Sequence, residues 1–287
     1  MQNNEIMKII PWQPGMVPES GKCYSGIPNE VYHEFRAWHG SSMIKHAIRS
    51  VESFHYEATQ PNKQSMALDR GSAVHSGIEG LATDGTMKLF NDLVIESPSG
   101  DKSKTWRELK EANPEKAVLT SAEIEKARTM AEKLHRKADK SRYFDAGWPE
   151  LSFFWVDERT GIKLKCRPDW LRLDSGGWMP DYKTTKAHSP DGFAKEIANY
   201  NYHLSAAMYL AGVLVVTGVD VQNWRFLVIA NTPPLEVEGY WLDARSLEEG
   251  KMLLRHLLDK IAGYTPTEEI ESQEIGLPRW AFKMTEY

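Results

Sequence analysis

Apolar positions recur with a helical period through much of the first half of the chain. Helices are expected over residues 41–56, 65–81 and 120–140. Ser41-Ser42 is a candidate N-cap for the first helix, and Thr120-Ser121 followed by Glu123 has the capping pattern expected at the start of the third. The third helix is strongly charged, so its polar side is expected to face solvent. The polar segment 97–114 is interpreted as an excursion between the second and third helices.

After Glu150 the pattern becomes typical of strands. Strands are expected over residues 151–156, 162–173 and 178–184. Turns at 157–161 and at Ser175-Gly176-Gly177 would connect them into an antiparallel meander. Helices follow at 191–198 and 202–216, then strands at 224–230 and 237–242, and a final helix at 244–261. This order predicts an α/β fold in which helices flank a mixed central sheet.

The first forty residues are rich in proline and glycine and predict an irregular N-terminal arm. Trp12, Tyr24, Tyr32 and Trp38 are interleaved in it, which indicates that the arm packs against the rest of the molecule. The expected organisation is an arm over 1–40, one domain over 41–264, and a short, partly packed C-terminal appendage over 265–287.

Composition narrows the class of protein. With 287 residues, 41% of them hydrophobic, the chain can bury a substantial core. No apolar run approaches the roughly 18 residues that span a bilayer, and no secretory signal is evident, so a cytoplasmic protein without a membrane partner is expected. Cys23 and Cys166 are too few for a disulfide framework or a four-thiolate metal site. The net charge of -5 argues against a protein that coats DNA, but it allows a local basic groove.

Candidate chemistry gathers in the expected meander. Asp181 and Lys183 are two positions apart on a strand, so their side chains leave the same face of the sheet. The glycine turn would fold the preceding strand, with Asp169, back against Asp181, and Glu150 begins the strand before that. Three carboxylates and an amine would then converge on one end of the meander. This ligand set suits a hard cation such as Mg²⁺.

Such a site suits phosphodiester hydrolysis. The cation would polarise a phosphoryl oxygen and activate water, while Lys183 would orient the water or stabilise the developing charge. The alternative is an ordinary surface ion pair between Asp181 and Lys183, worth under about 1 kcal/mol. Because short Asp-x-Lys triplets occur often by chance, the triplet alone does not decide between the two.

A larger ordered set of residues resembles a known nuclease pattern. The set consists of Gly71-Ser72-Ala73-Val74-His75, Glu150, Arg167-Pro168-Asp169, Asp181-Tyr182-Lys183-Thr184-Thr185 and Tyr209. It is similar to the RecB-like and RecE-type (exonuclease VIII) members of the PD-(D/E)xK superfamily, and the resemblance covers residues 65–212 and, more loosely, the arm from Gly26. It implies a restriction-endonuclease-like core in which His75, Asp169 and Asp181 bind the metal. Glu150 would complete the site, and Lys183 would be catalytic.

The resemblance also implies an activity and partners. The expected enzyme is a Mg²⁺-dependent exonuclease of phage or prophage recombination and DNA repair that degrades one strand of linear double-stranded DNA. It would act 5′ to 3′ and leave 3′ overhangs. Mn²⁺ is expected to substitute because His75 is among the ligands. A homo-oligomeric ring, tetrameric or trimeric, and a single-strand annealing protein as working partner are implied in the same way.

One position departs from the family pattern. Relatives commonly carry Gln four residues before the tyrosine retained here as Tyr209, whereas this chain has Ser205. Because Ser205 is too short for the same reach, either His203 or another group substitutes, or activity is reduced.

Contacts to DNA are expected from two basic groups. Lys163, Lys165 and Arg167 alternate on one strand and would form a basic strip on the face that carries Asp169, although an ordinary exposed hairpin face is an equal alternative. Lys45, Arg49 and Arg70 lie near the first two helices and suggest a 5′-phosphate pocket.

Several other residues carry a functional and a plainer interpretation. Gly71 would allow close approach of DNA or simply pack, and His75 alone would more often be a satisfied helix histidine than a ligand. The strand tryptophans are expected in the core rather than as base-stacking platforms. Tyr202 and Tyr209 are expected to pack on the sheet, with Tyr209 at the edge of the site and in reach of DNA.

Three alternatives to an exonuclease remain open. A repair or restriction endonuclease would use the same site and would cut closed circular DNA. A catalytically silent DNA-binding or anti-nuclease module would keep the fold, which Ser205 allows but the intact Asp169, Asp181 and Lys183 disfavour. An α/β protein unrelated to nucleic acids would bind no divalent metal at these residues.

Overall fold

The computed structural model describes residues 7–61, 64–174, 177–266 and 274–276. Its strands are β1 (Ile9–Pro11), β2 (Lys22–Ser25), β3 (Val94–Glu96), β4 (Ala117–Leu119), β5 (Trp148–Pro149), β6 (Ser152–Val156), β7 (Lys163–Cys166), β8 (Trp170–Leu171), β9 (Trp178–Thr185), β10 (Asn223–Ala230) and β11 (Val237–Tyr240). Its helices are α1 (Asn29–Glu34), α2 (Ser41–Ile44), α3 (His46–Arg49), α4 (Val51–Thr59), α5 (Met66–Thr83), α6 (Lys88–Leu93), α7 (Lys104–Ala112), α8 (Ser121–Lys140), α9 (Pro190–Asn199), α10 (Tyr202–Thr217) and α11 (Ala244–Ala262).

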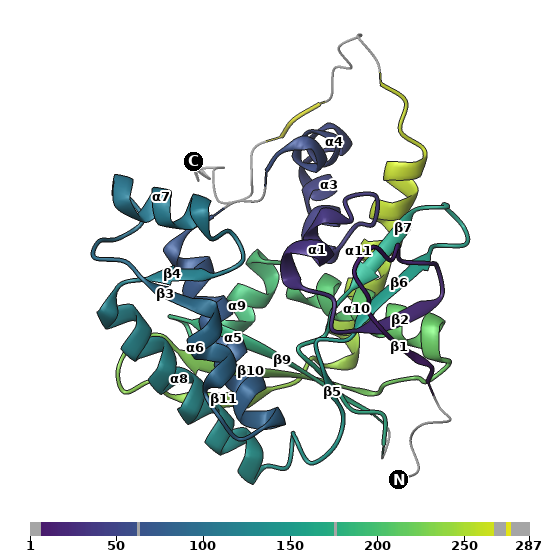
Figure 1. The fold of residues 1–287 in the computed structure, drawn as a ribbon. Coiled ribbons are helices and arrows are strands. Elements are labelled where there is room, and N and C mark those ends of the chain that lie inside the picture. The colour runs from purple at the N-terminus through teal and green to yellow at the C-terminus, as the bar shows by residue number, and fades with distance from the viewer. Residues whose placement is uncertain (1–6, 62–63, 175–176, 267–273, 277–287) are drawn as a thin grey trace, which may run out of the picture.

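Two larger sheets organise the molecule. One has the strand order β1-β2-β6-β7 and the other the order β11-β10-β9, and β3 with β4 and β5 with β8 form two short pairs. In Figure 1, α5, α6 and α8 gather on one side, the four-stranded sheet with α10 and α11 lies on the other, and β9 and β10 run between them. The expected α/β fold, a mixed sheet with flanking helices, is confirmed.

The N-terminal arm is more regular than expected. Its strand β2 pairs antiparallel with β6, and β1 pairs parallel with β2, so the arm extends a sheet of the main domain. Side chains alternate across β6: Phe153 belongs to the main core, whereas Phe154 contacts the aromatic cluster of the arm. The packing expected of the arm aromatics is confirmed, since Tyr24, Tyr32 and Trp38 surround Phe154 at edge-on angles.

The meander is confirmed only in part. Strands β6 and β7 are antiparallel as expected. The chain then leaves the ladder at Arg167-Pro168-Asp169, where Pro168 has no N–H to donate. Beyond this break β8 pairs with β5, and β9 pairs in parallel with β10 instead of folding back along its predecessor. The strand expected over 178–184 is present as β9, but its expected antiparallel pairing with the preceding strand is wrong, apart from a single bridge between Arg172 and Trp178.

The helices with clear capping residues form as expected. Ser65 caps α5 and Thr120 caps α8, each accepting a backbone N–H with its hydroxyl. The single helix expected over 41–56 is wrong, because the chain divides there into α2, α3 and α4. Gly40, not Ser41-Ser42, is the N-cap of the first of these.

The polar segment 97–114 is not irregular throughout. It contains α7, which buries Trp106 and Lys110 on one face of an otherwise polar sequence. The 265–287 appendage falls almost wholly outside the described residues. None of the helices in the described ranges combines the length and the apolar character that a membrane-spanning helix needs.

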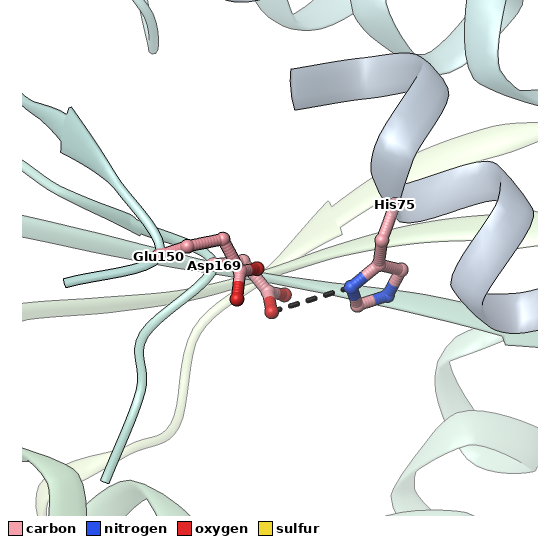
Figure 2. Close-up of side chains that lie close together, drawn as sticks. All are labelled: His75, Glu150 and Asp169. Atoms are coloured by element: carbon pink, nitrogen blue, oxygen red, sulfur yellow. Dashed lines mark ion pairs between the residues drawn. The ribbon is translucent and has the colours of Figure 1, made fainter. Parts of the chain in front are cut away.

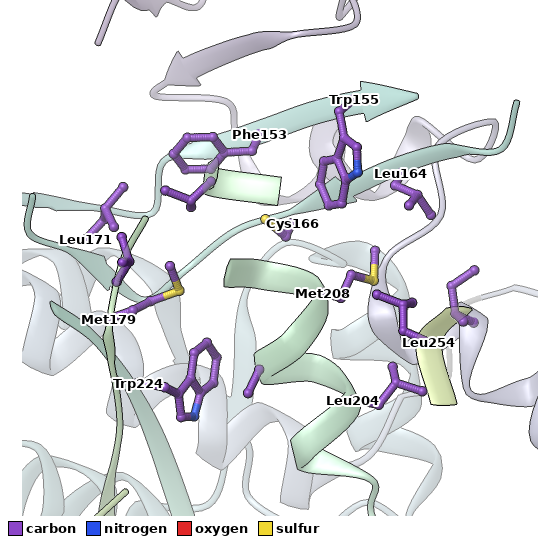
Figure 3. Close-up of a cluster of buried hydrophobic side chains, with 14 of the residues drawn as sticks. Phe153, Trp155, Leu164, Cys166, Leu171, Met179, Leu204, Met208, Trp224 and Leu254 are labelled. Carbon is purple, nitrogen blue, oxygen red and sulfur yellow. The ribbon is translucent and has the colours of Figure 1, made fainter. Parts of the chain in front are cut away.

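Helix α10 lies at the centre of the main core. Figure 3 shows it among side chains from β6, β7, β9, β10 and α11, including Trp155 and Cys166. Gly212 makes this close approach possible, because a Cβ there would lie 2.6 Å from the ring of Trp155. A second core joins α5 to α8 and to one face of β9 and β10. The strand β9 is thus fixed from both sides, which fixes the position of the residues it carries.

Candidate metal centre

Three side chains from separate parts of the sequence meet beside β9. They are His75 from α5, Glu150 from just after β5, and Asp169 from the break between β7 and β8, and one ligand atom of each lies within 4.8 Å of the others. Figure 2 shows the imidazole facing the two carboxylates. The side chains remain 30%, 34% and 12% exposed, in that order, so a small ion can reach them from solvent.

Local backbone geometry places the two carboxylates together. Glu150 adopts a φ of 47°, in the left-handed region that side chains other than glycine rarely occupy and that costs about 1–3 kcal/mol. Its N–H donates to the carbonyl of Asp169 at 3.4 Å. The pairing of Pro149 with Trp170 continues this contact into the β5–β8 ladder. Glu150 is thus held in its strained conformation by the pairing of β5, which ends just before it, with β8, which begins just after Asp169.

The contacts of His75 point to a cation. Its Nε2 lies 3.1 Å from the carbonyl oxygen of Tyr182, which can only accept, so Nε2 carries a hydrogen and donates. Its Nδ1 lies 3.3 Å from Oδ1 of Asp169. In a neutral ring, Nδ1 would then point its lone pair at the carboxylate of Asp169, and the two would repel each other. Either a proton or a metal ion must therefore lie between Nδ1 and this carboxylate. One imidazole nitrogen and two carboxylate groups form a donor set that fits a divalent cation.

The two carboxyl groups differ in ionisation. Burial raises the pKa of Glu150 to about 8, and the negative charge of Asp169 adds to the shift. Burial also acts to raise the pKa of Asp169, but His75, Lys183 and the N–H of Tyr182 outweigh it, so the net shift is downward. That N–H donates to Oδ2 at 2.6 Å. Asp169 is therefore the stably charged ligand, and Glu150 gains most from a bound cation.

Asp181 and Lys183 lie next to this group on β9. Their side chains share a face, as the strand period predicts, and form an ion pair with each other. Burial lowers the pKa of Lys183, but the carboxylates of Asp181 and Asp169 outweigh it and the net shift is upward, so the amine stays protonated. Asp181 lies outside the group of three, and its Oδ2 is the atom that contacts the ammonium of Lys183. The metal-ligand role of Asp181 stays a prediction.

Two further groups beside the centre are not apparent from the sequence motifs. Glu79 follows His75 by one helical turn on α5 and is partly buried. Burial raises its pKa, and Arg167, Asp169 and His75 all act on its charge, which places it beside the centre. The i, i+4 spacing from His75 was a signal for it. The carbonyl of Tyr182, which contacts both His75 and Lys183, left no such signal because every residue has one.

The expected basic strip on β7 is wrong for two of its three members. Lys165 is only 6% exposed, and its ammonium donates to the carbonyls of Tyr32 and Phe35 in the arm. Arg167 donates to Ser152 Oγ and to the carbonyl of Ile27. Both side chains are buried because the arm covers Lys165 on β7 and Arg167 just beyond the end of this strand. Lys163 alone is exposed, and its contact with DNA stays a prediction.

The residues of the expected 5′-phosphate pocket lie in different settings. Lys45 places its ammonium 5.5 Å from the ring centre of Tyr202, near Lys183. Arg70 forms an ion pair with Glu123 of α8, and Arg49 is exposed. A shared pocket stays a prediction that the pairing of Arg70 disfavours.

Two further expectations concern packing around the site. Tyr209 is partly buried against the main core, as expected, with its ring 5.8 Å from that of Trp224. A role for it at DNA stays a prediction. A Cβ on Gly71 would meet nothing within 4 Å, so this glycine is not required by packing within the described residues.

The mixed sheet, the flanking helices and the acidic site beside β9 define the class of protein as PD-(D/E)xK-like. Residues 40–272 match the PDDEXK-like domain of unknown function DUF3799, and the chain belongs to this family. The fold is similar to the crystal structure of a Eubacterium rectale protein provisionally described as an exonuclease, with a TM-score of 0.55 and 15% identity over 88% of this chain and 96% of the other. No curated protein matches the sequence.

Proposed function

We propose that the protein is a metal-dependent exodeoxyribonuclease of the RecE type, which hydrolyses one strand of linear double-stranded DNA from its 5′ end. The proposal rests on one observation. Asp169, which closes the group of three with His75 and Glu150, accepts the N–H of Tyr182, the residue between Asp181 and Lys183. A cation-binding group is thereby joined to the strand that carries a protonated amine, the combination that phosphodiester hydrolysis requires.

Each residue has a distinct role in this proposal. A divalent cation, Mg²⁺ or Mn²⁺, bound by His75, Asp169 and Glu150 would polarise a phosphoryl oxygen. Lys183 stays protonated beside Asp181 and can donate to a phosphate oxygen on which negative charge develops. Tyr182 fixes the orientation of His75 through its carbonyl oxygen.

The finer parts of the proposal come from the resemblance to RecE-type enzymes. They are the 5′-to-3′ direction, the 3′ overhang, a ring-shaped homo-oligomer and hand-over of the product to a single-strand annealing protein. The competing function on the same residues is an endonuclease for repair or restriction, which differs in not requiring an end. A silent DNA-binding module is disfavoured because Asp169, Asp181 and Lys183 are all in place.

End-labelled linear duplex, nicked circle and closed circle, each with Mg²⁺ or EDTA, separate these functions. The wild type should degrade linear DNA from its 5′ ends only with Mg²⁺, and Lys183→Ala should lose about 10²–10³ in rate, the effect typical of removing a group that stabilises developing charge. Lys186→Ala removes an exposed lysine just beyond β9 and serves as the matched control. Cleavage of closed circles would establish the endonuclease instead. DNA binding without cleavage would establish the silent module.

A further inference from the structure

An exposed tyrosine lies between α9 and α10, stacked on a second tyrosine whose ring contacts Lys183. Tyr200 is 57% exposed, and one face of its ring stacks on Tyr202 with centroids 5.5 Å apart and planes 26° from parallel. Asn201, between them, has a φ of 51° in the left-handed region, which asparagine tolerates better than most residues. The sharp turn at Asn201 brings the rings of its two neighbours together and leaves Tyr200 open to solvent.

The inner ring of this stack carries two ammonium groups. Lys183 lies 5.2 Å and Lys45 lies 5.5 Å from the ring centre of Tyr202. Lys183 has Asp181 as its ionic partner, whereas Lys45 has no carboxylate partner among the described residues. Two cations on one ring repel each other, so the pair favours the arrival of an anion.

An exposed tyrosine ring and an ammonium without a carboxylate partner among the described residues therefore both contact the ring of Tyr202. A nucleotide presents the complementary groups, an aromatic base and an anionic phosphate. Base–aromatic stacking is tolerant of sequence, because every base has a π-face, and it combines with backbone cations in sites that hold single strands. In an intact duplex the neighbouring bases cover that face at every position except the outer side of the terminal pair, so an unpaired end exposes much more of it.

We propose that Tyr200 stacks on an unpaired nucleobase at the DNA end, while Lys45 binds a phosphate of the same strand. This inference rests on the proposed function and narrows its substrate: the site takes a strand whose terminal bases have separated from the duplex. Tyr200 acts as a positioning residue that feeds the strand toward Lys183. Blunt duplex would then have to fray before it is cut, and a short unpaired end would be the preferred substrate.

Binding without turnover tests the inference apart from catalysis. The full-length protein in EDTA is titrated into fluorescent duplexes with a short unpaired 5′ end, in which an abasic site replaces each unpaired nucleotide in turn. Tyr200→Ala should weaken binding of the complete strand by roughly 5- to 150-fold, the range that base stacking spans. Tyr200→Trp should retain binding. Tyr56→Ala, which removes a tyrosine that is 64% exposed on α4, is the matched control and should change nothing.

The abasic series distinguishes stacking from general surface loss. At one position the abasic site should weaken the wild type as much as Tyr200→Ala does, and should have no further effect in that variant. Equal binding by wild type and Tyr200→Ala, or independent effects at every position, would overturn the inference while leaving the nuclease proposal intact. Failure of the wild type to bind or cleave any of the DNAs would overturn both.

Discussion

Arg167 connects the N-terminal arm to the candidate metal centre. Its side chain is 8% exposed, its guanidinium lies 3.9 Å from the ring centre of Tyr32, and its Nε lies 3.9 Å from Oε2 of Glu150. It also donates to the carbonyl of Ile27 and to Ser152 Oγ. A buried cation in this position favours the ionised form of Glu150, whose pKa burial raises. Arg167 is therefore a positioning residue for a carboxylate that is itself expected to bind metal.

Replacing Arg167 with Met should weaken metal binding. Because residues that orient a ligand typically contribute 10- to 100-fold to metal affinity, a loss of about tenfold is expected for Mn²⁺, measured by calorimetry. Arg159→Met serves as the control, since Arg159 forms an exposed ion pair with Asp259 away from the three ligands. Unchanged Mn²⁺ affinity in a folded Arg167→Met protein would show that Glu150 needs no such support.

For individual residues of the site, the sequence predicted the arrangements that depend on short-range backbone geometry. The shared face of Asp181 and Lys183 follows from the strand period and is present. The approach of His75 to Asp169 was available only through the ordered motif, because 94 positions of chain separate them. The burial of Lys165 and Arg167 was not predictable: a period of two says which residues share a face, but not that the arm covers it.

Helix α5 carries His75 and depends on close contact with α8. A Cβ on Gly77 would lie 2.7 Å from Cβ of Ala131, closer than atoms can pack without movement. Gly77→Ala should therefore destabilise the protein by about 1–3 kcal/mol, the usual effect of overpacking. Because the shift would move α5 relative to β9, Mn²⁺ affinity should fall as well. Urea unfolding and calorimetry measure the two effects.

Gly71→Ala is the matched control on the same helix. A Cβ there meets nothing within 4 Å, so the substitution should stabilise the helix by about 0.5–1 kcal/mol. If Gly71 instead lies against DNA, the stabilised protein would bind DNA more weakly. A Gly77→Ala protein as stable as Gly71→Ala would contradict the tight α5–α8 contact.

Elements with their own capping signals were the ones predicted well. Ser65 and Thr120 begin α5 and α8 as expected. The division of residues 41–56 into three short helices was not predicted. Ser50 caps α4, but a serine can also occupy a position inside a helix, so the sequence alone did not mark a break there. The partner of β9 was predicted wrongly, because the true partner lies far along the chain. β9 pairs with β10, which begins 38 positions after β9 ends at Thr185.

The whole molecule depends on attachment of the arm to the main domain. His39 lies at this junction: its N–H donates to the carbonyl of Lys163 at 2.9 Å, and its carbonyl accepts from the N–H of Lys165 at 3.1 Å. Its ring is in edge contact with Phe54, with centroids 4.9 Å apart. Burial lowers the pKa of His39, and the charges of Lys165 and His55 lower it further. A proton on this ring therefore works against attachment of the arm.

The direction of the pH effect follows from the two pKa values. In the unfolded chain His39 takes up a proton near pH 6.5, whereas in the folded protein it does so only at lower pH. As the pH falls through 6.5, the unfolded state therefore binds the proton first and stability is lost; above that pH the contribution is fully present. His39→Gln should remove this part of the loss. Urea unfolding at pH 7.5 and 5.5 should show a smaller drop in unfolding free energy for His39→Gln than for the wild type.

A histidine that lies apart from the arm provides the control variant for His39→Gln. His256 is exposed on α11, and His256→Gln should keep the full drop of the wild type, since carboxylates and other groups contribute equally to both proteins. Limited proteolysis at the two pH values locates the effect, because cleavage within residues 7–39 should rise at pH 5.5 in the wild type and less in His39→Gln. An equal drop in all three proteins would mean that the arm stays attached whatever the charge of His39. In that case the acid sensitivity of the molecule would come from other groups whose pKa is lower in the folded protein, such as His33 of the arm and Asp169.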